Sequence, residues 1–197
     1  MAIVEEDMLV QPAQRLFTAA DLEALPTDLP SGPIDYELDN GRLVFIMVPP
    51  GDLHGAVQSN IVTELKVQGE RKGHGKARTE VGILLWRNPD RVVGADIVFV
   101  ANKSLPIRRT KQGYLETIPD LVVEIRSKND SRKYVQRKVQ HYLKAGVELV
   151  WIADWSTTTV TAHASSGEPV VYGEGDSLQL SDLIPGFSMA VADVFRE

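Results

Sequence analysis

Cysteine is absent from the sequence, and its absence removes several kinds of chemistry at once. Disulfide bonds, thiol nucleophiles and thiolate metal sites are excluded, so any catalytic group must use oxygen or nitrogen. No stretch approaches the ~20 consecutive apolar residues of a transmembrane helix. The acidic start, residues 1–7, also lacks the basic residues and the apolar run of a secretory signal. We therefore expect a cytoplasmic protein that does not enter the membrane.

Sequence motifs of several other enzyme classes are also missing. There is no phosphate-binding P-loop and no glycine-rich dinucleotide motif, which speaks against nucleotide cofactors. There is no G-x-S-x-G nucleophile elbow, and the four histidines do not form the H-E-x-x-H pattern of zinc hydrolases. Serine hydrolysis and zinc hydrolysis are therefore poor explanations, although an enzyme acting on another phosphate ester stays open.

The charge of the chain is unevenly distributed. The net charge is −6, which argues against a protein that coats DNA over its whole surface. Residues 101–150, however, contain 11 Lys/Arg and 5 Asp/Glu, so this segment carries +6. The segment could contact phosphates while the rest of the protein keeps it soluble, or it could be only a solvated helix face and a charged loop.

The length of 197 residues fits a single domain, with residues 1–17 as a loosely ordered N-terminal arm. A capping box at Thr18–Asp21 predicts a short helix that stops at Pro26. The turn Asp39-Asn40-Gly41 between apolar runs predicts a β-hairpin over residues 34–48.

The rest of the chain reads as a mixed sheet with helices. Helices are predicted from apolar residues at four-residue steps, and strands from β-branched runs between turn signals. The predicted elements are, in chain order, a helix over 53–72, strands over 76–86, 91–100 and 121–125, a helix over 131–145, a strand over 149–153, further strands, and a short closing helix over 189–195. The helix over 131–145 would form a right-handed βαβ crossover if its two flanking strands are parallel. The fold class is therefore α/β, in the α+β sense.

Two acidic residues stand inside strands that are otherwise apolar. Asp96 interrupts residues 92–100 and Glu124 interrupts residues 121–125, which is the pattern of strands covered on both faces. Buried carboxylates are normally paired, protonated or bound to a metal. Side chains alternate along a strand, so Arg126 should project from the same face as Glu124. Two carboxylates and a cation of this kind could hold a divalent ion and hydrolyse a phosphodiester.

A buried salt bridge explains the same residues without any catalysis. Arg126 or Lys138 would then neutralise one acid for packing reasons alone. Lys138 borders the apolar arc of the helix over 131–145, so its ammonium could reach inward to the acids or extend outward to water. Arg132 and Lys133 should be exposed, either as phosphate contacts or as solubilising charge.

Several stretches form an ordered set, although none of them is diagnostic alone. They are residues 36–44, Pro49-Pro50 with His54, residues 94–98, residues 119–127, and Lys138 and Tyr142 with residues 145–147 leading into residues 150–152. In this order they resemble the PD-(D/E)XK restriction-endonuclease superfamily, and specifically its large Uma branch. The resemblance covers nearly the whole chain.

The resemblance implies a restriction-endonuclease-like mixed β-sheet flanked by helices, here with an N-terminal hairpin and extra C-terminal strands. It implies that Asp96 and Glu124 hold Mg²⁺, with Mn²⁺ as a substitute, and that the reaction is hydrolysis of DNA phosphodiester bonds. The sequence departs from the family pattern at Ala95, which replaces a proline, and at Arg126, which replaces a lysine. A guanidinium stays protonated, so Arg126 can stabilise an anionic phosphorane but cannot act as a base. Lys138 is the expected substitute for the missing lysine.

Other positions of the family pattern carry further expectations. Glu37 is a third metal ligand, a supporting acid, or a hairpin residue paired with Arg42. His54 is either a satisfied core histidine or a supporting residue, since Mg²⁺ prefers oxygen ligands. Tyr142 and Ser127 are candidates for supporting roles. The basic residues expected to contact nucleic acid are Arg108, Arg109, Lys128, Arg132 and Lys133.

Two classes of function follow from these observations. The first is an active metal-dependent endonuclease, with Asp96 and Glu124 as ligands and Lys138, with or without Arg126, as the electrostatic catalyst. The second is a catalytically inactive nuclease-fold module that binds nucleic acid or a protein partner, with its carboxylates tied up by Arg126. Metal affinity separates the two. A homodimer is also expected, because cutting both strands is easiest with two symmetric sites.

Overall fold

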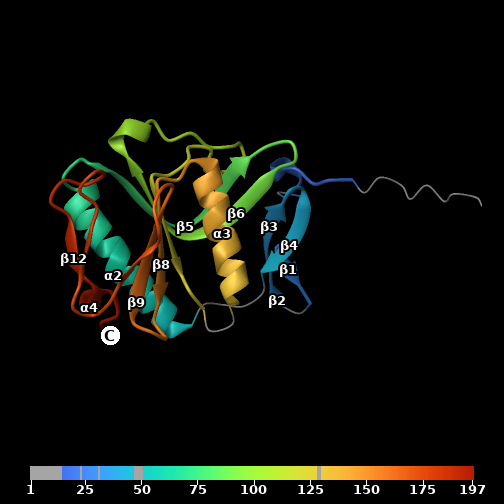
Figure 1. Cartoon of the computed structure of the whole chain (residues 1–197). Helices are drawn as coiled ribbons and strands as arrows, with labels where there is room; N and C mark the ends of the chain where they lie inside the picture. Colours follow the sequence, from blue (N-terminus) through green and yellow to red (C-terminus); the bar gives the residue numbers. More distant parts are fainter. Residues whose placement is uncertain (1–14, 23, 31, 47–50, 128–129) are drawn as a thin grey trace, which may run out of the picture.

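A mixed sheet of eight strands forms the centre of the structure, a computed structural model that describes residues 15–22, 24–30, 32–46, 51–127 and 130–197 (Figure 1). The strand order is β10-β9-β8-β7-β6-β3-β4, and β5 pairs with β6 beside this path. The pair β7 and β8 is parallel and the other pairs are antiparallel. The strands are β3 (Asp35–Asp39), β4 (Arg42–Ile46), β5 (Gly75–Trp86), β6 (Arg91–Ala101), β7 (Leu121–Ile125), β8 (Leu149–Asp154), β9 (Thr159–Ala164) and β10 (Val170–Tyr172).

Helices cover both faces of this sheet, as the sequence predicts. They are α1 (Ala19–Leu22), α2 (Asp52–Glu64) with its π-helical continuation η1 (Leu65–Glu70), the 3-10 turn η2 (Asn102–Ser104), α3 (Arg132–Ala145) and α4 (Val191–Val194). Two small sheets complete the fold, formed by β1 (Asp28–Leu29) with β2 (Gly32–Pro33) and by β11 (Ser177–Gln179) with β12 (Ser188–Ala190). In the described part of the chain, none of the helices has the length and apolar character needed to cross a membrane.

The local signals near the N-terminus are confirmed. The capping box is reciprocal, because the Thr18 amide donates to the Asp21 carboxylate at 2.8 Å and the Asp21 amide donates to the Thr18 hydroxyl at 3.3 Å. Asn40 and Gly41 have φ of 52° and 78°, which is the backbone of a tight hairpin turn between β3 and β4. Residues 47–48 of the predicted hairpin and residues 1–14 of the predicted arm lie outside the described residues.

The predicted crossover is also confirmed as a parallel unit. Ser131 caps α3 by accepting a hydrogen bond from the Tyr134 amide at 3.2 Å, and Gly146 ends the helix at φ 104°. The strands that flank α3, β7 and β8, are parallel neighbours. The predicted helix over 53–72 is present as α2, but its last turns, Leu65–Glu70, have π-helical hydrogen bonds.

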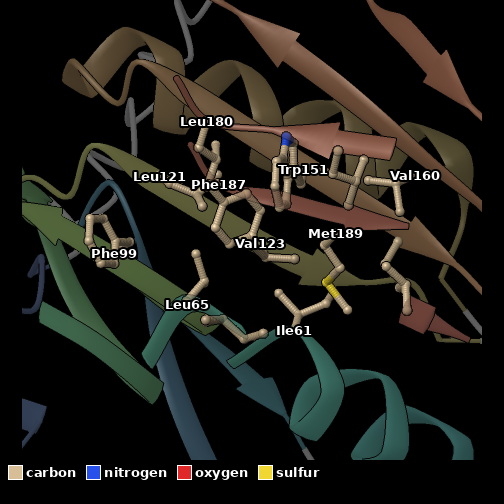
Figure 2. Close-up of a cluster of buried hydrophobic side chains, with 14 of the residues drawn as sticks. Ile61, Leu65, Phe99, Leu121, Val123, Trp151, Val160, Leu180, Phe187 and Met189 are labelled. Atoms are coloured by element: carbon tan, nitrogen blue, oxygen red, sulfur yellow. The ribbon is translucent and has the colours of Figure 1, made fainter. Parts of the chain in front are cut away.

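Buried apolar residues form a cluster on each face of the sheet. We call the cluster beneath α2 the α2 core; it contains residues such as Ile61, Leu65, Phe99, Val123, Trp151 and Phe187 (Figure 2). We call the cluster beneath α3 the α3 core; it contains residues such as Ile83, Val98, Val122, Val139, Tyr142 and Val150. Side chains of β7 alternate between the two cores, which is the reason for the continuous apolar run in its sequence.

The strands β5 and β6 change faces in the middle of the sheet. In β6, Val93 and Ala95 pack in the α3 core, whereas Ile97 and Phe99 pack in the α2 core. These four residues are spaced by two and would share one face in a regular strand. The alternation is therefore broken at Asp96, between Ala95 and Ile97.

The alternation of side chains in β5 is also interrupted, at Glu80, the position that faces Asp96. Residues Thr79 and Val81 pair with Ile97 and Ala95, so Glu80 lies opposite Asp96 without a bridge. Glu80 has φ of 50°, a left-handed conformation that a non-glycine residue seldom adopts within a strand. This conformation rotates the ribbon and places Asp96 at the seam between the two cores.

Candidate active site

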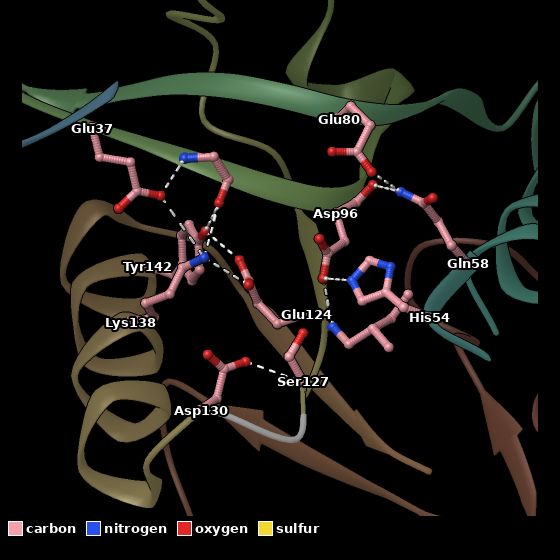
Figure 3. A network of polar contacts seen from close by, with 12 residues as sticks. Glu37, His54, Gln58, Glu80, Asp96, Glu124, Ser127, Asp130, Lys138 and Tyr142 are labelled. Atoms are coloured by element: carbon pink, nitrogen blue, oxygen red, sulfur yellow. Dashed lines mark hydrogen bonds and ion pairs between the residues drawn. The ribbon is translucent and has the colours of Figure 1, made fainter. Parts of the chain in front are cut away.

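The two acids that interrupt apolar strands face one cleft. The register of β6 on β7 pairs Ile97 with Val123 and, continued by one residue, brings Asp96 opposite Glu124. The cleft has a volume of about 520 Å³. It is lined by Glu37, His54, Glu80, Asp96, Glu124 and Lys138, among other residues (Figure 3). Asp96, Glu124 and Lys138, which the sequence singles out, are thus brought together.

Asp96 is held from the side of α2. Its Oδ2 accepts a hydrogen bond from the Ile125 amide at 2.6 Å and lies 3.3 Å from Nε2 of His54. The hydrogen bond to Asp96 raises the pKa of His54, although burial of the imidazole opposes this. His54 therefore contacts Asp96 from α2 and is not an isolated core histidine. Among the described residues, no hydrogen bond reaches Oδ1 of Asp96.

Glu124 is held from the side of α3. Its Oε1 accepts from the Tyr142 hydroxyl at 2.5 Å, and its Oε2 accepts from Nζ of Lys138 at 2.7 Å. Burial, together with the negative charge of Asp96, raises the pKa of Glu124 to about 7 against the opposing influence of Lys138. Ionised Glu124 is therefore costly in this position, and an added positive charge near it would relieve that cost.

The ammonium of Lys138 points inward to the acids and does not extend outward to water, the two alternatives that the sequence left open. Besides Glu124, its Nζ donates to the Gly94 carbonyl at 2.9 Å and lies 4.0 Å from Oε1 of Glu37. Burial alone would lower the pKa of Lys138, but the charges of Glu124 and Glu37 outweigh burial and raise it. The raised pKa favours the protonated form of Lys138, a cation that can stabilise negative charge nearby.

Glu37 lies on the far side of Lys138 from Asp96 (Figure 3). It accepts a hydrogen bond from the Gly94 amide at 2.8 Å, and its cross-strand partner in the hairpin is Val44. Within the part of the chain that the structure describes, Glu37 forms no ion pair with Arg42 and no hydrogen bond with Asp96. This placement favours a supporting role for Glu37, as an acid that positions Lys138.

Arg126 turns away from both candidate acids. The strand β7 ends at Ile125, so the alternation that would place Arg126 beside Glu124 does not extend to it. Its guanidinium instead pairs with Asp154 at 2.5 Å and reaches the Asp130 carbonyl at 3.4 Å. Burial opposes ionisation of Asp154, but hydrogen bonds from Ser156 and Arg126 lower its pKa.

The remaining predicted residues lie around the cleft or at the surface. Ser127 lines the cleft, and its amide donates to Asp130 at 2.8 Å. Arg109 lines a smaller cavity of about 190 Å³ that shares Glu80 with the cleft. The other predicted basic residues are Arg108, Arg132 and Lys133, which are exposed, and Lys128, which lies outside the described residues.

Two residues were missed by sequence reasoning: Glu80, which lines the cleft, and Gln58, which contacts Glu80. Gln58 donates through one amide nitrogen to Glu80 Oε1 at 2.5 Å and to the Asp96 carbonyl at 2.9 Å. It lies one helical turn after His54, and this spacing of four is the signal that could have found it. Glu80 looks like an ordinary solvent-facing acid of a strand, and no sequence signal marks its unusual backbone.

The donor set fits a hard divalent cation. Asp96 and Glu124 offer oxygen, Oδ1 of Asp96 has no hydrogen bond from a described residue, and each oxygen of Glu124 keeps a second lone pair. Within the described residues, no group of three or more His, Asp or Glu side chains is arranged to hold a metal. Two carboxylates are sufficient for Mg²⁺, which usually keeps several waters and binds one or two protein carboxylates.

Comparisons with known proteins agree with the fold and the order of motifs. The structure is similar to the crystal structure of a "putative nuclease belonging to DUF820" from Anabaena variabilis ATCC 29413, with a TM-score of 0.72 and 21% sequence identity. The match covers 91% of this chain and 97% of that one, and at this identity it shows a shared fold. No curated protein matches the chain. The model of the Uma2 family, described as "Putative restriction endonuclease", matches residues 19–192. The chain therefore belongs to the Uma2 family, which confirms the resemblance seen in its motifs.

Proposed function

We propose that this chain is a metal-dependent endonuclease that hydrolyses phosphodiester bonds of DNA. The observation that carries the proposal is the convergence of Asp96 and Glu124 in one cleft, beside a lysine that stays protonated. Membership of a family described as restriction endonucleases supports nuclease chemistry. Mg²⁺ as the ion and DNA as the substrate rest on the family resemblance. The expected homodimer rests on the task of cutting two strands, and the expected cytoplasmic location rests on the sequence.

In the proposed reaction each residue of the site would have a role that follows from its contacts. Asp96 and Glu124 would hold a divalent ion, which when bound neutralises charge on the phosphate and lowers the pKa of a coordinated water. Lys138 would stabilise the charge that develops on the phosphate oxygens in the transition state. Tyr142 and Glu37 position Glu124 and Lys138 through the hydrogen bond and the ion pair described above.

A binding module without catalysis is the second candidate. The observation in its favour is that both oxygens of Glu124 already accept hydrogen bonds, from Tyr142 and Lys138. The version in which Arg126 ties up the acids has no support, because Arg126 pairs with Asp154. A module of this kind would bind Mg²⁺ or Mn²⁺ no better than an unrelated acidic protein.

Cleavage of supercoiled plasmid by the purified protein is the test of the proposed function. We expect nicking with Mg²⁺ or Mn²⁺ that stops with EDTA and is abolished in Glu124→Gln, which keeps an oxygen for Tyr142 but removes the charge. The control is Asp182→Asn, an exposed acid that does not line the cleft. An inactive wild type that also binds no Mn²⁺ in calorimetry would favour the binding module.

Removal of the exposed cations at the start of α3 should weaken DNA binding without preventing the chemistry. Arg132 and Lys133 are exposed next to the helix cap at Ser131. Every phosphate that no longer has a cationic partner should reduce the slope of log Kd against log salt by about 0.9. We therefore expect Arg132→Gln/Lys133→Gln to raise KM, to reduce the salt slope by up to about 2, and to leave kcat nearly unchanged. An unaltered salt slope would show that these residues are only solubilising charge.

A further inference from the structure

Hydrolysis at this site needs a group that takes the proton of the attacking water. This requirement rests on the proposed function. The cations of the neighbourhood are already engaged, because Lys138 donates to Glu124 and to the Gly94 carbonyl, and Arg126 is a guanidinium paired with Asp154. Glu124 and Asp96 are the expected ligands of the divalent ion, so their remaining lone pairs would be engaged when the ion is bound. An additional acid in the cleft would supply the missing function.

Glu80 is an acid of the cleft with a free oxygen. Its Oε1 accepts from Gln58 at 2.5 Å, and the same amide nitrogen of Gln58 donates to the Asp96 carbonyl at 2.9 Å. Gln58 therefore holds the Glu80 carboxylate next to Asp96 (Figure 3). None of the hydrogen bonds between described residues uses Oε2 of Glu80. The residue is exposed and lines the cleft, so this oxygen can reach a water in it.

The backbone at Glu80 adds an independent observation. Its φ of 50° lies in the region that glycine adopts at little cost and other residues adopt at a cost. A glycine at this position would form the same turn of the ribbon without strain. The presence of a glutamate at a strained position is consistent with a requirement for its side chain.

His54 is one rival proton acceptor, and its geometry argues against it. Its Nε2 faces Oδ2 of Asp96, so that nitrogen is occupied by the contact with a carboxylate. Its Nδ1 is buried without a hydrogen-bond partner among the described residues, and the side chain is 10% exposed. Nδ1 is therefore closed to a water in the cleft, and Nε2 is engaged with Asp96. His54 positions Asp96, while Glu80 faces the space where substrate would lie.

We infer that Glu80 is a catalytic residue that accepts the proton of the attacking water during phosphodiester hydrolysis. The water oxygen forms a bond to phosphorus, its proton passes to Glu80, and the bond from phosphorus to the leaving sugar oxygen breaks. The leaving oxygen takes a proton from solvent, and Glu80 later returns its proton to solvent. No atom is oxidised or reduced. Gln58 acts as a positioning residue, because it fixes the Glu80 carboxylate without touching the substrate.

The first experiment separates proton transfer from metal binding. Glu80→Gln keeps the acceptor oxygen for Gln58 but cannot take a proton. General base catalysis contributes about 10²- to 10⁴-fold, so we expect kcat for plasmid nicking to fall by about 10²- to 10³-fold. KM for DNA and the calorimetric affinity for Mn²⁺ should stay at wild-type values. A loss of Mn²⁺ affinity like that of Asp96→Asn would make Glu80 a ligand and overturn this role.

The second experiment uses the strained backbone. Glu80→Gly should raise the melting temperature because it removes the strain, abolish nicking, and regain part of the activity when formate replaces the missing carboxylate. Thr158→Gly is the matched control, since Thr158 is exposed outside the cleft with φ of 49°. It should also melt later, but its cleavage should be of wild-type rate and insensitive to formate.

The outcomes distinguish this inference from the proposed function. A wild type that cuts plasmid, together with a Glu80→Gln variant that cuts equally fast, overturns the role of Glu80 and leaves the proposed function standing. A wild type that cuts nothing under any metal condition overturns the proposed function and this role with it. Slow cleavage by Glu80→Gln with unchanged Mn²⁺ affinity, and formate rescue of Glu80→Gly, are the results expected.

Discussion

Lys138→Met is expected to slow plasmid cleavage by about 10²- to 10³-fold and to lower the free energy of unfolding by about 3–5 kcal/mol. The ammonium contacts the Glu124 carboxylate at 2.7 Å, and its side chain is only 12% exposed. Its removal leaves a buried carboxylate without its cationic partner, which is the costly way to break an ion pair. Cleavage should fall because the cleft no longer contains the cation proposed to stabilise charge on the phosphate.

The loss of stability in Lys138→Met should depend on pH with a definite sign. The pKa of Glu124 is already raised from 4.5 to about 7, and removal of Lys138 raises it further. A carboxyl with a raised pKa binds its proton more tightly in the folded state, so folding stability falls as pH rises through that pKa. Urea unfolding with EDTA present should therefore show a smaller loss near pH 5 than near pH 8. An equal loss at both pH values would contradict this account.

Two variants serve as controls for Lys138→Met. The double variant Glu124→Gln/Lys138→Met removes both charges, so it should recover most of the stability, while cleavage should be abolished as in Glu124→Gln. Arg126→Met breaks the ion pair with Asp154, which lies outside the cleft lining. It should lower the melting temperature but leave metal-dependent cleavage within a few-fold of wild type.

Asp96→Asn is expected to reduce cleavage by about 10³-fold, equivalent to ~4 kcal/mol in the activation free energy. The amide oxygen of asparagine can still accept from the Ile125 amide, so the seam of the sheet is preserved. What disappears is the negative charge that would help to hold the divalent ion. We expect the free energy of unfolding in EDTA to change by about 1 kcal/mol or less.

Calorimetry decides how the reduced cleavage by Asp96→Asn is interpreted. The variant should bind Mn²⁺ much more weakly than wild type, in contrast to the unchanged affinity expected of Glu80→Gln. The charge of Asp96 also contributes to the raised pKa of Glu124, so that pKa should move down in the variant. Full cleavage by Asp96→Asn would remove Asp96 from the metal site.

Much of the fold could be predicted because its signals are local. The Asp39-Asn40-Gly41 turn, the cap at Ser131 and Gly146 past the end of α3 each act within a few residues. The parallel pairing of β7 with β8 follows from two apolar strands joined by a helix. The π-helical end of α2 could not be predicted in this way, because no residue type in Leu65–Glu70 marks that geometry.

The residues of the candidate site also fall into two groups, those marked by a local sequence signal and those that depend on tertiary contacts. Asp96 and Glu124 stand out because a charge inside an apolar run is rare, and Lys138 stands out because it borders a helix face. The partner of Arg126 could not be read from strand alternation, because it depends on where β7 ends and on a residue of β8. Glu80 could not be identified either, because its left-handed backbone and its position opposite Asp96 are seen only in the three-dimensional structure.

At Glu80 and Asp96 the side chains of β5 and β6 switch from one face of the sheet to the other. As a result, the two candidate ligands, Asp96 and Glu124, are held by residues that belong to opposite faces. Asp96 is held through His54 of α2, and Glu124 through Lys138 and Tyr142 of α3. The distance between the carboxylates of Asp96 and Glu124 therefore depends on how α2 and α3 pack against the two faces of the sheet. A small change of volume in either layer would widen or narrow that gap without altering a ligand. The preference of such a site among ions of different radius can thus be adjusted from the buried interior.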